Sequence, residues 1–136
     1  MTHAHFETAF NNFTPDKTNA QLQTFIPALD ITLVNGSTDQ AISALLAPGQ
    51  RHAFFMNAHC CNIHRSNKSY ARAVAAADVL LPDGVGVAIA AKMAGQELAA
   101  NLNGTDFVPV LLQQAAKQGK SVFLFGGKPG TADAAA

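Results

Sequence analysis

The chain has 136 residues, of which 49% are hydrophobic, and its nine basic side chains balance nine acidic ones. This length and composition suit one domain with its own core, and the lack of net charge gives no overall field that would recruit nucleic acid or an anionic membrane. No stretch approaches the roughly 20 apolar residues of a membrane-spanning helix, and the first residues lack the basic and apolar regions of a secretory signal. Cys60 and Cys61 are adjacent, a spacing that rarely meets disulfide geometry, so we expect a reducing compartment.

The first part of the chain predicts an arm, then two strands with a helix between them. Residues 1–28 are polar with scattered phenylalanines and indicate an arm or a short amphipathic helix. The alternating, β-branched sequence of residues 29–34 predicts a strand, after which an Asn-Gly turn and a serine cap begin a helix that ends near Leu46. A second strand is expected over residues 52–57, where a continuous apolar run suits a sheet buried on both faces.

The central part of the chain predicts a helical region, a buried strand and an apolar helix. The helical region covers residues 59–76, and the strand covers residues 78–81. Pro82 stops this strand because proline cannot donate to a sheet ladder and keeps the residue before it extended. Asp83 is therefore expected at the carboxyl end of a strand, with a glycine-spaced helix opening at Gly84. In an open parallel α/β sheet, ligands bind at that edge.

The last part of the chain predicts a helix, a strand and a glycine-rich turn. Thr105 is the expected N-cap of the helix, because Asp106 follows in the first turn, where the helix dipole favours a negative charge. Residues 121–125, SVFLF, predict a last buried strand. The strand leads into the turn at residues 126–130, after which another helix begins.

Strand and helix patterns alternate from residue 29 to residue 136. This alternation predicts a Rossmann-like α/β domain, in which helices cover both faces of a mainly parallel sheet. The last helix starts at Thr131 and has made fewer than two turns at Ala136. We therefore expect the fold to continue beyond this chain.

Two polar residues at strand ends are the main candidates for chemistry. Asp83 is either an N-cap of the helix that follows it or a general base at a ligand crevice, and these roles can coexist. In an inverting glycosyl transfer, such a carboxylate accepts the proton of the attacking sugar hydroxyl while a nucleoside diphosphate leaves from the opposite side. Asn57 is expected at the same sheet edge, where it either contacts a sugar or caps the next helix.

The remaining motifs are weaker. Lys128 and the free amides of its glycine-rich turn could face a phosphate, although such a sequence is more often only a turn. The dinucleotide fingerprint GxGxxG is absent after the first strand, which argues against a Rossmann-type oxidoreductase. A metal site is not expected, because structural zinc commonly needs spaced pairs of ligands and the chain has only one cluster, formed by His59, Cys60, Cys61 and His64.

The sequences AADVLLPDGVGVAIAAKMAG and NGTDFVPVLLQQAAKQGKSVFLFGGKPG, with the strand that ends in Asn57, resemble the WecG/TagA/CpsF family of bacterial glycosyltransferases. The resemblance covers roughly residues 29–136. It implies transfer of a sugar such as N-acetylmannosamine or a hexose from a UDP donor to an undecaprenyl-diphosphate-linked acceptor, with inversion and without an obligatory metal or other cofactor. It also implies polysaccharide or cell-wall synthesis at the cytoplasmic face of the membrane. Asp83 corresponds to the family's proposed base, and the substrate-binding positions are Asn57, Gly84, Asn101, Gly104, Asp106, Gly126, Gly127 and Lys128.

The sequence departs from the family pattern at two site positions. Phe55 stands where the family commonly has Thr, and Asn101 stands where the family often has Arg, so a cation that could balance a diphosphate is missing. Family members also continue well beyond this length, so we expect little turnover from the chain itself. A non-catalytic remnant or interaction module of the same fold is the alternative function, and a homo-oligomer is left open.

Overall fold

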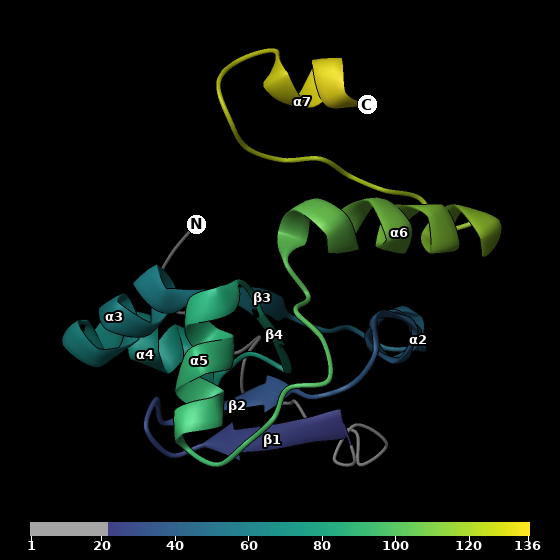
Figure 1. Ribbon diagram of the computed structural model, residues 1–136. Helices are drawn as coiled ribbons and strands as arrows, with labels where there is room; N and C mark the ends of the chain where they lie inside the picture. The colour runs from purple at the N-terminus through teal and green to yellow at the C-terminus, as the bar shows by residue number, and fades with distance from the viewer. Residues whose placement is uncertain (1–21) are drawn as a thin grey trace.

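The computed structural model describes residues 22–136 of the chain. The arm expected over residues 1–28 therefore falls largely outside the described residues. The described part is a mixed α/β structure (Figure 1), whose elements in chain order are β1 (Gln23–Ile26), β2 (Ile31–Val34), α2 (Thr38–Leu46), β3 (Ala53–Met56), α3 (Ala58–Ser66), α4 (Lys68–Ala75), β4 (Val79–Pro82), α5 (Val85–Met93), α6 (Gly104–Lys117) and α7 (Thr131–Ala135).

The strands form two pairs. β1 and β2 pair antiparallel, and β3 and β4 pair parallel, with Met56 opposite Pro82 at the carboxyl end. β2 also contacts β4, although no ladder of backbone hydrogen bonds joins them. The predicted strands over residues 29–34, 52–57 and 78–81 are confirmed, and the parallel pair with its covering helices confirms the α/β class.

β1 was not predicted, because its residues fall in the stretch assigned to the arm. Its four residues are bounded by a turn in which Leu29 N donates to Ile26 O at 3.0 Å. The turn includes Asp30 with a φ of 52°, the left-handed region that aspartate tolerates better than most residues. Because Ile26 is fully buried, this short hairpin contributes to the core.

Helices cover the strands from two sides, as expected for a Rossmann-like domain. Helices α3, α4 and α5 lie on one side of the strands and α2 on the other (Figure 1). Neighbouring residues of β4 divide accordingly: Leu80 joins the core on the side of α3 to α5, and Val79 and Leu81 join the core beneath α2 and α6. All four β4 residues are buried, as expected for that strand, but Ala53 and Phe54 of β3 are exposed, so the prediction that residues 52–57 are buried on both faces is wrong.

Helices α2, α3, α4 and α6 start at side-chain caps, two of which differ from the prediction. Ser37 caps α2 as expected, in a reciprocal capping box with Gln40. The helical region predicted over residues 59–76 is broken at Asn67, whose Oδ1 accepts from the amides of Ser69 and Tyr70 and so starts a second helix, α4. The cap of α6 is Asn103 rather than Thr105.

The reason for the shift at α6 is a pair of hydrogen bonds between Asn103 and Asp106. Asn103 Oδ1 accepts from the Asp106 amide at 3.1 Å, and Asn103 Nδ2 donates to Asp106 Oδ2 at 2.8 Å. With Asn103 as the cap, Asp106 occupies the third helical position, where its carboxylate returns to the cap residue. Asp106 lies in the first turn as predicted.

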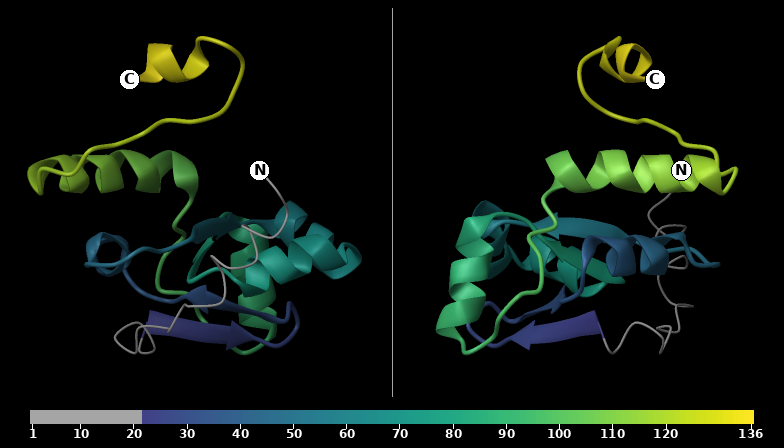
Figure 2. Two further views of the ribbon diagram at one scale, coloured as in Figure 1. Left: turned by 180° about the vertical axis from the view of Figure 1, so that it is seen from behind. Right: turned by 45° about the vertical axis from the view of Figure 1, so that its right-hand side comes forward.

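Residues 121–125 do not form the predicted buried strand. The segment is extended and pairs with no other strand among the described residues, and Phe123 and Phe125 are 87% and 95% exposed. Figure 2 shows it leaving the end of α6 and leading away from the strands towards α7. A strand is stable only with a neighbour to pair with and a face to bury, and here the segment has neither. None of the helices between residues 22 and 136 is long and apolar enough to cross a membrane; the longest, α6, has 14 residues.

Candidate active site

Asn57 and Asp83 lie at the same edge of the parallel strand pair, as the sequence predicts. Each residue directly follows a strand, β3 or β4, and the paired residues Met56 and Pro82 immediately precede them. The Asp83 amide extends the ladder by donating to Met56 O at 2.9 Å. The two half-buried side chains are therefore carried on neighbouring strand ends.

Asn57 is the N-cap of α3. Its Oδ1 accepts from the Cys60 amide at 2.9 Å, so the capping interpretation of this residue is correct. Within residues 22–136, its side-chain nitrogen Nδ2 donates to no protein group. Asn57 can therefore cap α3 through one atom and offer two N–H donors to a ligand through the other.

Asp83 is not a helix cap. The N-cap of α5 is Gly84, and no side chain provides a capping hydrogen bond there. The Asp83 carboxylate makes no hydrogen bond or ion pair with any of the described residues. The capping interpretation of Asp83 is thus wrong, because the N-cap position falls one residue later, on Gly84, whose φ of 90° makes the turn into α5.

The two glycines that follow Asp83, Gly84 and Gly86, have different structural roles. Gly84 supplies the positive φ of the turn, and nothing lies within 4 Å of where its Cβ would be. Gly86 allows close packing, because a Cβ there would lie 3.0 Å from the Cβ of Ala58 in α3. The first turns of α3 and α5, which follow Asn57 and Asp83, therefore contact each other directly behind the candidate site.

Asn101 reaches the same turn from the connector between α5 and α6. Its Oδ1 accepts from the Gly84 amide at 2.7 Å. The next residue, Leu102, donates its amide to Pro82 O at 2.9 Å and is buried in the core. The structure thus brings Asn101 to Gly84, as the predicted site requires, but with its acceptor oxygen turned towards the protein backbone.

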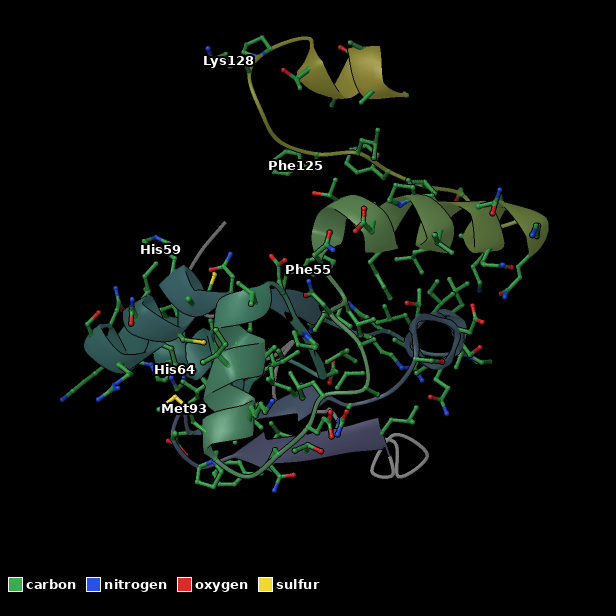
Figure 3. The ribbon with its side chains drawn as sticks, in the orientation of Figure 1. Phe55, His59, His64, Met93, Phe125 and Lys128 are labelled. Carbon is green, nitrogen blue, oxygen red and sulfur yellow. The ribbon has the colours of Figure 1, made fainter. Side chains whose placement is uncertain are left out.

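The start of α6 is packed against Phe55, the residue found in place of the family's threonine. A Cβ at Gly104 would lie 3.7 Å from the Phe55 ring, an ordinary van der Waals contact, so the chain at Gly104 packs against that ring. Phe55 and Phe107 pack edge to face, with ring centroids 6.1 Å apart and planes at 75°. In Figure 3, Phe55 lies at the beginning of α6. Gly104 is therefore a packing position, and the Asp106 carboxylate is bonded to Asn103.

The glycine-rich turn is not brought to the site. Figure 3 shows Lys128 on the far side of α6 from Phe55, on the segment that leads to α7. Gly126 and Gly127 adopt positive φ angles of 119° and 79°, and Thr131 begins α7 as predicted. Among the described residues, the predicted binding positions therefore form one group around Asp83 and a second, separate group around Lys128.

The Cys-His segment lies on α3 and contributes to packing. The thiol of Cys61 is buried, and this burial, followed by the neighbouring Cys60, raises its pKa. A hydrogen bond with Cys60, and then burial, raise the pKa of Tyr70 to about 12. Over residues 22–136, no three His, Cys, Asp or Glu side chains gather where a metal ion could be held. A small apolar pocket near β1, β2 and α2 includes none of the predicted site residues.

Sequence reasoning missed Asn35, which follows β2 and holds the connector. Its Nδ2 donates to Thr24 Oγ1 at 3.0 Å and to Glu97 O at 3.1 Å, and its Oδ1 accepts from the Ala99 amide at 2.7 Å. The signal available in the sequence is an asparagine directly after a strand, a pattern that equally predicts a turn. Through its bond to the Ala99 amide, Asn35 holds the backbone of the connector two residues before Asn101.

Comparison with known proteins gives two matches. Residues 26–136 match the model of the glycosyl transferase WecG/TagA/CpsF family. The chain is also 37% identical over 60 residues to an N-acetylglucosaminyldiphosphoundecaprenol N-acetyl-beta-D-mannosaminyltransferase of Bacillus spizizenii strain W23, a stretch that covers 44% of this chain and 23% of that protein. No solved structure matches. Because the family match extends over most of the chain and includes every candidate site residue, the protein belongs to the WecG/TagA/CpsF family of glycosyl transferases.

Proposed function

We propose that the protein acts as an inverting glycosyltransferase that moves a sugar of the N-acetylmannosamine or hexose type from a UDP donor to a polyprenyl-diphosphate-linked acceptor. The process is polysaccharide or cell-wall synthesis at the cytoplasmic face of the membrane. Family membership supports glycosyl transfer. The name of the Bacillus spizizenii relative, which specifies a mannosaminyl group and a diphosphoundecaprenol acceptor, supports the substrate class.

The observation that carries the proposal is the unengaged Asp83 carboxylate beside Asn57 at the carboxyl edge of two parallel strands. A general base must have a free lone pair within hydrogen-bond reach of the proton that it accepts. A carboxylate committed to a helix cap or an ion pair is less available for this purpose. Asp83 has neither commitment within the described residues.

The proposed step moves one proton and exchanges one bond at the anomeric carbon. The Asp83 carboxylate accepts the proton of the acceptor hydroxyl. At the same time, the oxygen of that hydroxyl forms a bond to the anomeric carbon of the donor sugar. The bond from that carbon to the UDP oxygen breaks on the opposite face, and UDP leaves with the electron pair, so the configuration inverts. The free N–H groups of Asn57 are suited to a sugar or diphosphate oxygen.

The test is transfer by the chain with Asp83→Asn, which keeps the shape of the side chain and removes the base. We expect the kcat with UDP-N-acetylmannosamine and a diphosphoundecaprenol-linked acceptor to fall by about 10²-fold or more, with an unchanged circular dichroism spectrum. Asp133→Asn is the matched control, because Asp133 is exposed on α7. If Asp83→Asn kept its kcat within twofold of the unmodified chain, the role of Asp83 would be refuted.

Two observations favour the alternative, a non-catalytic module of the same fold. Asn101 stands in place of the expected cation, and Lys128 lies on the far side of α6 from Phe55 (Figure 3). Titration calorimetry with UDP distinguishes the two functions. Absence of both UDP binding and transfer by the unmodified chain would support the alternative, whereas UDP binding that weakens in Asn57→Ala would support the transferase.

A further inference from the structure

The orientation of Asp83 depends on the two peptide units that flank its Cα. Both polar groups of the unit before it are bonded: Pro82 O accepts from the Leu102 amide, and the Asp83 N–H donates to Met56 O, each at 2.9 Å. The unit after it carries the Gly84 N–H, which donates to Asn101 Oδ1 at 2.7 Å. Because peptide units are planar, fixing both of them fixes the direction of the Asp83 Cα–Cβ bond.

The bond from Asn101 is the one side-chain contribution to this arrangement among the described residues. The other two bonds are made by the backbone of β3 and of the connector, so they persist whatever side chains are present. Gly84 itself gives no rigidity, since glycine adopts positive φ angles as readily as negative ones. Without a partner for the Gly84 amide, the Asp83–Gly84 unit loses its restraint, and the backbone at Asp83, which sets the direction of the Cα–Cβ bond, is held from one side only.

Asn101 is held in place by its own neighbours. Leu102 is 1% exposed and packs with Val79, Leu81 and Phe107, so the backbone beside Asn101 is anchored in the core. Upstream, Asn35 bonds the connector at Glu97 and Ala99. The short Asn101 side chain is carried on this anchored backbone. It therefore presents its Oδ1 in a fixed direction to the Gly84 amide.

From this geometry we infer that Asn101 is a positioning residue that sets the direction of Asp83, in place of the substrate contact that the sequence suggested. The inference rests on the proposed function, because it gives Asp83 the part of general base. Asn101 acts through the Gly84 amide and does not contact the reacting atoms. Its loss should therefore reduce turnover more than donor binding.

The decisive variants are Asn101→Leu, which keeps the approximate shape without an acceptor, and Asn101→Asp, which keeps an acceptor oxygen. In the full 136-residue chain, we expect amide hydrogen exchange at Gly84 to become at least tenfold faster in Asn101→Leu and to stay within threefold of the unmodified chain in Asn101→Asp. The exchange of the Asp83 amide, which is bonded to Met56 O, is the internal control and should not change. Unchanged exchange at Gly84 in Asn101→Leu would overturn the inference.

Kinetics then separate positioning from binding. We expect Asn101→Leu to lower kcat about tenfold with the KM for the UDP donor changed less than twofold, and Asn101→Asp to recover most of the kcat. A loss confined to KM, or a tighter donor affinity in Asn101→Arg with no loss of kcat, would assign the position to diphosphate binding and overturn the inference. If the unmodified chain shows neither UDP binding nor transfer, the proposed function fails, whereas the exchange data still decide whether Asn101 holds the turn.

Discussion

At the scale of single residues, the candidate site depends on how closely two helices approach behind it. Gly86 of α5 and Ala58 of α3 meet where a Cβ on the glycine would be 3.0 Å from the alanine Cβ. This separation is too short for two methyl groups, so one helix must move if Gly86 gains a side chain. Since α3 and α5 begin directly after Asn57 and Asp83, a movement of either helix would shift the site residue that precedes it.

The substitution Gly86→Ala tests this contact. Overpacking costs about 1–3 kcal/mol, whereas replacing a helical glycine by alanine gains about 0.5–1 kcal/mol. We therefore expect a net loss of about 1 kcal/mol in the free energy of unfolding, measured by urea denaturation. The substitution Ala58→Gly removes the opposing methyl group. The double variant should therefore have a higher free energy of unfolding than the sum of the two single effects predicts. Strict additivity would show that the two helices are not in contact there.

At the scale of elements, sequence reasoning succeeded where one residue type permits one conformation. Pro82 ended β4 and placed Asp83 at the strand end, and Ser37 started α2. It failed where an asparagine side chain offered the backbone an alternative hydrogen bond. Asn67 divided a predicted helix, and Asn103 displaced Thr105 as a cap, because asparagine can bond the backbone in more than one local conformation.

The start of α6 gives a direct test of this competition. Asn103→Ala removes the acceptor for the Asp106 amide and the donor to its carboxylate, so the free energy of unfolding should fall by about 1 kcal/mol. Thr105→Ala should change it by less than about 0.5 kcal/mol, because Thr105 is exposed within the first turn. Urea denaturation of the two variants shows which residue caps α6. A larger loss in the free energy of unfolding for Thr105→Ala than for Asn103→Ala would support Thr105, the cap predicted from the sequence.

At the scale of the whole molecule, the α/β class and the edge that holds Asp83 and Asn57 could be predicted, but the environment of residues 121–125 could not. Local pattern identifies a segment that is able to form a strand. It contains no information about whether a neighbouring strand is free to pair with it. The same limit applies to Lys128, whose position depends on that segment, and to Asn101, whose bond to Gly84 spans 17 residues.

The exposed segment gives a prediction about solubility. Phe123→Ser combined with Phe125→Ser should change the free energy of unfolding by less than about 0.5 kcal/mol, because neither ring is buried. It should also reduce self-association, since exposed apolar clusters promote contacts between molecules. Leu81→Ala, in the core, is the comparison and should cost about 2–5 kcal/mol. Urea denaturation measures the stability of each variant, and sedimentation velocity measures its self-association. If the phenylalanine substitutions lowered the free energy of unfolding as much as Leu81→Ala does, the segment would be packed as a strand.

Asn35 exposes the connector to a slow chemical change. It precedes Gly36, and an Asn-Gly sequence is the one in which the following backbone nitrogen most readily attacks the side-chain amide and expels ammonia. The product carboxylate could no longer donate to Thr24 and Glu97, and its charge would face the Glu97 carbonyl oxygen. Stored protein would therefore lose part of the support for Asn101 as deamidation proceeds, and its age would become a variable in every assay of the site.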